Sequence, residues 1–105
     1  MVHHIVLMTL KPELPESVAE EMMLKTRMSL LKIPEARNVR CGKRIDPENH
    51  YPFFISADFE SMDKLGVYLE DAIHVKYVEE VIKPMAESWV VLDYEMEPGK
   101  DVRYS

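Results

Sequence analysis

Hydrophobic and polar residues follow patterns along this chain that predict four strands and three helical segments. Residues 2–10 (VHHIVLMTL) are mostly β-branched or large and apolar, and Lys11 and Pro12 end the run, which predicts a strand. Because side chains on a strand alternate between its faces, one face would carry His4, Val6, Met8 and Leu10, and the other His3, Ile5, Leu7 and Thr9. Both faces are largely apolar, so we expect each of them to be covered.

A helix is predicted over residues 16–32, and Ile33-Pro34 ends it because a residue before proline avoids the helical region. One wide apolar face of this helix contains Val18, Ala19, Met22, Met23, Leu30 and Ile33. A second stripe, spaced i, i+4, i+7, contains Leu24, Met28 and Leu31. One stripe should pack on a sheet, and the other belongs either to adjacent core or to a partner contact.

The rest of the chain alternates between strand and helix patterns. Residues 36–45 read as a strand in which Gly42 suggests a bulge, residues 46–52 as a loop, and residues 53–60 as a strand. Ser61 is a candidate N-cap for a helix over residues 62–73, and a second helical stretch covers 74–83. Residues 89–96 form the last predicted strand, and residues 97–105 a polar tail outside the domain of residues 1–96.

This order of elements is a repeated split β-α-β unit, so the predicted fold class is α+β, a ferredoxin-like antiparallel sheet with helices on one face. The helices can cover only one face of such a sheet. The second face would carry His3, Ile5, Leu7, Phe54, Val90, Leu92 and Tyr94. Since a large exposed apolar patch usually marks an interface, we expect a second copy of the chain to cover it, forming a homodimer.

Length and charge narrow the class of protein. The 105 residues fit one domain. The net charge of −6 argues against nucleic acid or an anionic membrane surface as a partner. No stretch is apolar for the roughly 20 residues of a membrane span, and the start of the chain lacks signal-peptide features. The single cysteine, Cys41, suits a reducing cytoplasm.

Four stretches of the sequence, in this order and at this spacing, resemble one family: HHIVLMTLKP, KIPEARNVRCGKRI, VYLEDAIHVKYVEEVIKP and WVVLDYE. The chain resembles the stress-responsive A/B-barrel (Dabb) family over residues 1–96. The resemblance implies a dimeric α/β barrel, in which two chains pair through their sheets. The family includes a plant polyketide cyclase, and related dimeric barrels include antibiotic-biosynthesis monooxygenases.

The resemblance carries over to three residues. His4 matches the family's histidine before the first apolar run, and Tyr68 and His74 match the outer residues of a Tyr-x-x-His-Pro-x-His stretch. Asp71-Ala72 replaces the His-Pro of that stretch, which alters the local charge. In the cyclase, the matching tyrosine and second histidine resemble an acid/base pair, so Tyr68 and His74 are the candidate catalytic residues.

The residues themselves allow two interpretations of these candidates. A histidine at the end of an apolar stripe can act as a general base near neutral pH, but His74 could equally satisfy backbone groups at a helix junction. Tyr68 could be an ordinary core tyrosine, and His4 a capped histidine at a strand end. The predicted ligand-binding residues on the helix side are His4, Val6, Phe53, Ile55, Trp89 and Val91.

The other residues with reactive or charged side chains give weaker evidence of a function. Cys41 has basic neighbours but no catalytic signature around it. The cluster of Arg37, Arg40, Lys43 and Arg44 is typical of a solvated edge strand, although it could guide an anionic ligand. His3 and His4 point to opposite faces and cannot jointly bind a metal. No HExxH, CxxC or phosphate-loop motif occurs, so we expect no metal or cofactor.

Three functions remain open. The first is a small pocket for an apolar or aromatic ligand with cyclase-like or isomerase-like proton transfer next to a carbonyl, in which His74 is the base and Tyr68 a donor. The second is a non-enzymatic dimeric stress or binding module. The third, less favoured, is a cofactor-free monooxygenase. An apolar cleft with a few polar groups is the usual pattern of a ligand site.

Overall fold

The computed structural model describes residues 1–97, so the predicted polar tail lies, apart from Glu97, outside the described residues. The elements are β1 (Val2–Leu10), α1 (Val18–Leu30), β2 (Arg37–Lys43), β3 (Phe53–Phe59), α2 (Met62–Glu70), α3 (Ala72–Tyr77), the π-helix η1 (Val78–Ile82), α4 (Lys83–Met85) and β4 (Ala86–Glu95). Among these residues, no helix has the length and apolar character needed to cross a membrane.

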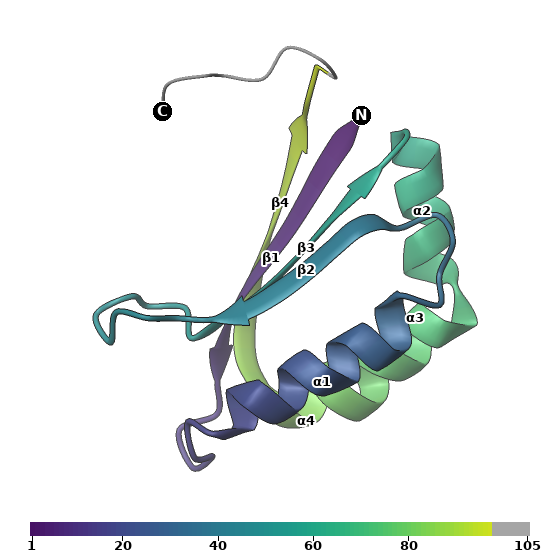
Figure 1. Ribbon diagram of the computed structural model, residues 1–105. Helices are drawn as coiled ribbons and strands as arrows, with labels where there is room; N and C mark the ends of the chain where they lie inside the picture. Colours follow the sequence, from purple (N-terminus) through teal and green to yellow (C-terminus); the bar gives the residue numbers. More distant parts are fainter. Residues whose placement is uncertain (98–105) are drawn as a thin grey trace.

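The four strands form one antiparallel sheet in the order β2-β3-β1-β4, and the helices lie on one side of it (Figure 1). This arrangement confirms the predicted ferredoxin-like α+β fold. The first strand lies between the third and the last, so Leu7 is opposite both Phe54 and Val90. β2 and β4 are the two edges of the sheet.

The helix-facing side of the sheet holds the core. Val18, Met22 and Leu30 of α1 are buried against it, as the wide apolar face of this helix predicts. The second stripe of α1 points away from the core, with Leu24, Met28 and Leu31 exposed by 57%, 62% and 66%. It is therefore not part of the subunit's own core.

The helical region after β3 breaks earlier than the sequence pattern predicts. The expected helix over 62–73 ends at Glu70, because Asp71 adopts an extended conformation (φ −60°, ψ 135°) and its Oδ1 accepts a hydrogen bond from the Ile73 N–H at 2.8 Å. Asp71 is thus the N-cap of α3, a position that aspartate favours. The predicted N-cap at Ser61 is confirmed, since its hydroxyl accepts a hydrogen bond from the Lys64 N–H at 3.2 Å.

The prediction of a bulge at Gly42 is wrong. The irregularity of β2 lies between Arg37 and Arg40, where Asn38 has a positive φ of 51°. Gly42 pairs regularly with Phe54, and a Cβ atom at position 42 would lie 2.8 Å from Cε1 of that ring. The glycine makes room for an aromatic ring packed over the strand.

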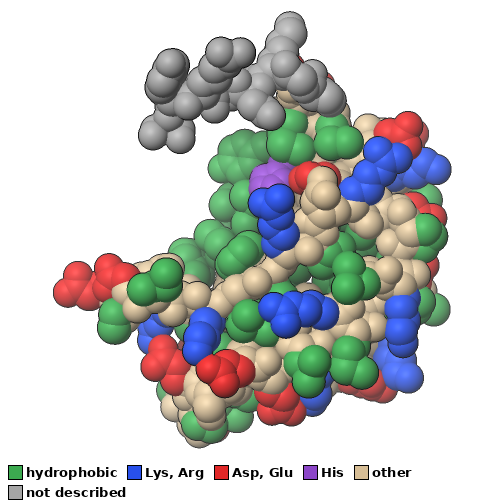
Figure 2. Space-filling model, in the orientation of Figure 1, with side chains coloured by type: hydrophobic (Ala, Val, Ile, Leu, Met, Phe, Trp, Pro, Cys, Tyr) green, Lys and Arg blue, Asp and Glu red, His purple; other side chains and the backbone are tan. Residues whose placement is uncertain are grey.

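Within residues 1–97, no helix covers the other face of the sheet (Figure 1). The register places His3, Ile5 and Leu7 on this face, as predicted, together with Phe54, Val90, Leu92 and Tyr94. Val90 and Tyr94 are exposed by 39% and 53%. Figure 2 shows hydrophobic side chains gathered over the sheet on the side of β2 away from the helices. This surface is called the open face below.

Candidate functional site

A small cavity lies where the helices meet the β1–β4 side of the sheet. It has a volume of about 220 Å³, and its wall consists of His4, Val6, Leu69, His74, Val78, Ile82, Trp89, Val91 and Asp93. The wall is mainly apolar, and its polar members are two histidines and one aspartate. Because β4 is an edge strand, Trp89 and Val91 remain 44% and 50% exposed at the mouth of this cavity.

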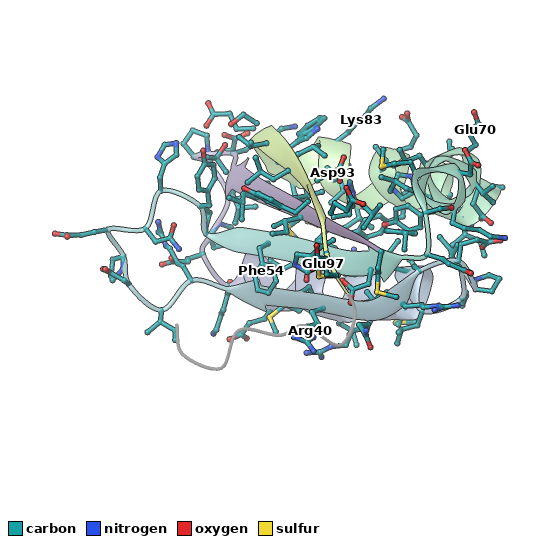
Figure 3. All side chains as sticks on the ribbon, turned by 90° about the horizontal axis from the view of Figure 1, so that it is seen from above. Arg40, Phe54, Glu70, Lys83, Asp93 and Glu97 are labelled. Atoms are coloured by element: carbon teal, nitrogen blue, oxygen red, sulfur yellow. The ribbon has the colours of Figure 1, made fainter. Side chains whose placement is uncertain are left out.

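His4 is held in place by a carboxylate from the neighbouring strand. Its Nδ1 lies 2.5 Å from Oδ1 of Asp93, the residue directly opposite it on β4. The His4 side chain is buried, whereas the Asp93 side chain is 34% exposed. Figure 3 shows Asp93 on β4, close to the helices. With Nδ1 engaged by Asp93, only Nε2 of His4 is available to another group.

His3 has an equivalent pair on the open face. Its Nδ1 lies 2.6 Å from Oδ1 of Asp58 on β3, and Asn38 donates a hydrogen bond to the other carboxylate oxygen at 2.9 Å. Burial raises the pKa of Asp58, but these hydrogen bonds and the charges of His3 and Arg40 outweigh it, so that the net shift is downward. The two adjacent histidines thus bind two carboxylates on opposite faces of one sheet.

His74 stands at the helical end of the cavity, beside Tyr68. The two ring centroids are 4.5 Å apart. Burial lowers the pKa of His74, and the nearby His4 lowers it further, while a hydrogen bond with the Leu69 backbone and the charge of Asp71 partly oppose the shift. A histidine with a lowered pKa is neutral at pH 7 and has a ring nitrogen able to accept a proton.

Tyr68 lies behind the cavity wall and is not part of it. Its side chain is buried, and its ring packs against His74, His4 and Phe59. Burial raises the pKa of Tyr68 far above its ordinary value, so the phenol keeps its proton.

Five of the eight predicted site residues line the cavity, and the other three lie outside its wall. Lining the cavity are His4, Val6, His74, Trp89 and Val91. Phe53 and Ile55 are buried core residues of β3 outside the cavity wall, and Tyr68 touches it only through His74 and His4.

Sequence reasoning missed Asp93, Leu69, Val78 and Ile82. Strand alternation places Asp93 on the same face as Trp89 and Val91, so the pattern contained this signal. Val78 and Ile82 are the first and last residues of η1, and π-helical turns are frequent at functional sites. Their i, i+4 spacing places both on one face of a helix, but the sequence does not show that this face meets the β1–β4 side of the sheet.

Cys41 and Lys43, two further residues with reactive or charged side chains, both contact α1. Burial raises the pKa of the Cys41 thiol, only partly offset by the charge of Arg27, and the thiol donates a weak hydrogen bond to the Met23 carbonyl at 3.7 Å. Lys43 forms an ion pair with Glu20 of α1 at 2.6 Å. Within residues 1–97, no group of three or more histidines, cysteines or carboxylates is placed to hold a metal ion.

Comparison with known proteins gives a family and several similar structures. The family model described as "Stress responsive A/B Barrel Domain" matches residues 2–96. Among solved structures, a Dabb family protein from Mesorhizobium loti has 22% identity and a TM-score of 0.76, covering 91% of this chain and 96% of that one. A dimeric ferredoxin-like protein of unknown function from Thermobifida fusca has 21% identity and a TM-score of 0.80, with 90% of each chain covered.

A hydroxynitrile lyase from Passiflora edulis is similar at 19% identity and a TM-score of 0.77, covering 92% of this chain and 94% of that one. A search of curated proteins gives no significant match. At these identities, the structural similarities establish the fold.

Proposed function

The chain belongs to the stress responsive A/B barrel domain family, and on that premise we propose that it is a homodimer whose pocket binds a small apolar ligand and catalyses proton transfer next to a carbonyl group. The observation that carries this proposal is the position of two imidazoles, His4 and His74, in the wall of one mainly apolar cavity. A protein of the same fold is named for a lyase activity, which supports the use of this scaffold for catalysis.

His74 is the proposed general base. It lines the cavity, and its lowered pKa keeps it unprotonated at neutral pH. A base of this kind removes a proton from the carbon next to a carbonyl and returns it to the product, which typically contributes 10²–10⁴-fold to the rate. The Tyr68 ring packed against His74 would hold the imidazole in one orientation.

His4 is the second polar group that a ligand would meet. Its Nδ1 is occupied by Asp93, so Nε2 is the atom left to interact with the ligand. The wall contains one carboxylate, Asp93, and no lysine or arginine. An uncharged ligand is therefore favoured over a carboxylate, which would lose its hydration without gaining a cationic partner.

The volume of the cavity limits the ligand to a small molecule. Drug-sized ligands occupy pockets of about 300–1,000 Å³, whereas a dry apolar cavity of about 150 Å³ is enough for benzene. The volume of this cavity, about 220 Å³, thus suits a single aromatic ring or a short aliphatic chain with one carbonyl group.

Acetophenone provides a direct probe. It has one ring and one acidic methyl group, and NMR in D₂O follows the exchange of its methyl protons for deuterium. We expect the wild-type chain to accelerate this exchange and His74→Ala to abolish the acceleration. His50→Ala is the matched control, because His50 lies in the exposed β2–β3 loop.

Two outcomes would contradict parts of this proposal. Binding of acetophenone at His4, His74 and Trp89, detected by chemical-shift changes, without any exchange would make the pocket a binding module and not an active site. Equal exchange by wild type and His74→Ala would exclude His74 as the base.

The proposed homodimer rests on the open face. Its apolar residues include Leu7, Phe54 and Leu92, and no helix in the described part of the chain covers them. Proteins of this fold from Bacteroides fragilis and Thermobifida fusca are described as dimeric. Covering one large apolar side chain contributes about 1.5–3 kcal/mol. Leu92→Asp should therefore give monomers in size-exclusion chromatography with light scattering, and a wild-type chain that is monomeric at micromolar concentration would refute the dimer.

A further inference from the structure

The cavity beside β4 has one polar end and one apolar end. At the polar end, Asp93 lies opposite His4 on the neighbouring strand. Val91 and Trp89 precede Asp93 at intervals of two residues on the same face, so the β4 part of the wall covers about 13 Å of strand. His74 belongs to the polar end, because His4 is close enough to influence its pKa. The wall therefore favours a ligand that is polar at one end and apolar at the other.

The carboxylate at the polar end has an oxygen to offer to a ligand. Oδ1 of Asp93 is engaged by Nδ1 of His4, whereas no group among residues 1–97 forms a hydrogen bond or ion pair with Oδ2. The Asp93 side chain is partly exposed and belongs to the cavity wall, so a bound molecule can reach it. An ionised carboxylate only accepts hydrogen bonds, so the group that meets Oδ2 has to be a donor.

The charges along this edge of the sheet are negative. β4 contains Glu87, Asp93 and Glu95 and no basic residue, and alternation places Glu95 on the same face as Asp93. Lys83, three residues before β4, forms an ion pair with Glu79 at 2.6 Å. Figure 3 shows Lys83 on the outer surface of the helices, outside the cavity. The electrostatic field at the cavity therefore attracts cations and repels anions.

We propose that the ligand of this cavity is a small organic cation, an apolar ring or short chain that carries a protonated amine. The apolar part lies against Val91 and Trp89, and the ammonium group donates a hydrogen bond to Oδ2 of Asp93. Such a charge-assisted hydrogen bond is roughly twice as strong as a neutral one. This inference rests on the proposed pocket and names the class of its ligand.

The class of ligand also suits the proposed chemistry. The two histidines and Asp93 share one end of the cavity, so the amine of a substrate would lie close to its carbonyl group. A positive charge there makes the neighbouring C–H bond more acidic and eases removal of its proton by His74. The amine thus serves both the binding of the substrate and the reaction.

Three probes of similar size and different charge test this inference. They are 2-phenylethylammonium, 2-phenylethanol and phenylacetate, and the first two have the same number of non-hydrogen atoms as acetophenone. Trp89 is the single tryptophan of the chain and lines the cavity, so its fluorescence reports binding. The titrations are run at pH 8, because a proton on either histidine of the wall would offset the charge of Asp93.

The three probes should bind in the order of their charge. We expect 2-phenylethylammonium to bind about 10-fold more tightly than 2-phenylethanol at low salt. Phenylacetate should bind most weakly, because its carboxylate loses hydration without gaining a cationic partner. High NaCl should weaken binding of the cation more than binding of the alcohol, since salt screens the charge of the partly exposed carboxylate.

Asp93→Asn is the decisive variant, and the ratio of the dissociation constants of the alcohol and the cation is the readout. Any general loosening of the pocket affects both constants, whereas loss of the charge affects only their ratio, which should fall from about 10 to about one. Glu48→Gln is the matched control, because it removes the same charge from the exposed β2–β3 loop and should leave the ratio within about twofold of wild type. Chemical-shift changes of the His4 and His74 rings locate the bound cation, and circular dichroism melts confirm that each variant is folded.

The outcomes separate this inference from the proposed function. A ratio near one in the wild type, or a ratio that Asp93→Asn leaves unchanged, would refute the cationic ligand, and exchange of acetophenone would then still support the proton transfer. Selective binding of the cation without any exchange of acetophenone would keep the class of ligand and remove the proposed chemistry. If neither the cation nor the alcohol changes the fluorescence or the chemical shifts at millimolar concentration, both proposals are wrong. A ratio that falls in Asp93→Asn and not in Glu48→Gln supports the inference.

Discussion

The pair formed by His4 and Asp93 gives the most direct test of how the site is built. Two substitutions probe it differently. Asp93→Asn keeps an oxygen that can accept the hydrogen bond of His4 Nδ1 but removes the negative charge. Asp93→Ala removes the acceptor and leaves the ring nitrogen of a buried histidine without a partner, because the His4 side chain is only 6% exposed.

The expected magnitudes differ for the two variants. A hydrogen bond to a charged group contributes about 1.5–3 kcal/mol and a neutral one about 0.5–1.5 kcal/mol. Since the Asp93 side chain is 34% exposed and solvent screens part of its charge, Asp93→Asn should lower the free energy of unfolding by about 0.5–1 kcal/mol. Asp93→Ala should lower it by about 1–3 kcal/mol, the usual cost of an unsatisfied buried group.

Urea unfolding at pH 7 measures these changes, provided that the m-value stays constant. In a domain of this size, 1 kcal/mol corresponds to about 4–8 °C in Tm. Nitrogen-15 NMR of the His4 ring reports in parallel whether Nδ1 still carries its proton. Equal stability of wild type, Asp93→Asn and Asp93→Ala would refute the reasoning, because it would mean that the short contact on β4 does not stabilise the buried imidazole.

Three further predictions concern stability. Gly42→Ala should lower the free energy of unfolding by about 1–3 kcal/mol, because its Cβ would lie 2.8 Å from an aromatic ring. Gly66→Ala on α2, where nothing lies within 4 Å, should instead raise the free energy of unfolding by about 0.5–1 kcal/mol. Equal effects of the two substitutions in urea unfolding would contradict this. Because burial lowers the pKa of His74, the unfolded chain binds more protons, so stability should fall below pH 6.5, by at most about 1.4 kcal/mol per pH unit, and less steeply in His74→Gln. Tyr77→Phe should cost about 1–3 kcal/mol in thermal unfolding, since it leaves the hydroxyl of the fully buried Thr26 without its partner, and an unchanged Tm would count against it.

Much of the fold followed from the sequence because strand periodicity is fixed by geometry. Alternation alone assigned His3 and His4 to opposite faces, and the register bears this out. The break at Asp71 was misplaced because a local capping hydrogen bond interrupts an apolar pattern that could have continued through it. Gly42 was misread because a glycine beside an aromatic ring and a glycine at a bulge look the same in one sequence.

The site was harder to predict because it depends on which strands are neighbours. Phe53 and Ile55 share a face with His4, but they belong to β3 and are buried in the core. The cavity lies beside the edge strand β4. Alternation gives the face of each residue and says nothing of its position across the sheet. Alternation gives the face of Asp93, but its contact with His4 follows only from the pairing of the first strand with the last.

That pairing has a consequence for how the protein folds during synthesis. The strand made first, β1, occupies the middle of the sheet and pairs from end to end with β4, so that Val2 lies opposite Glu95. Contacts this distant in sequence slow folding. At the usual translation rate of 5–20 residues per second, about 5–20 s pass between the synthesis of β1 and that of β4. During that time, Asp93 is not yet present to pair with His4. A nascent chain arrested before residue 86 should therefore bind chaperones through the bare edge of β1, and release should coincide with the emergence of β4.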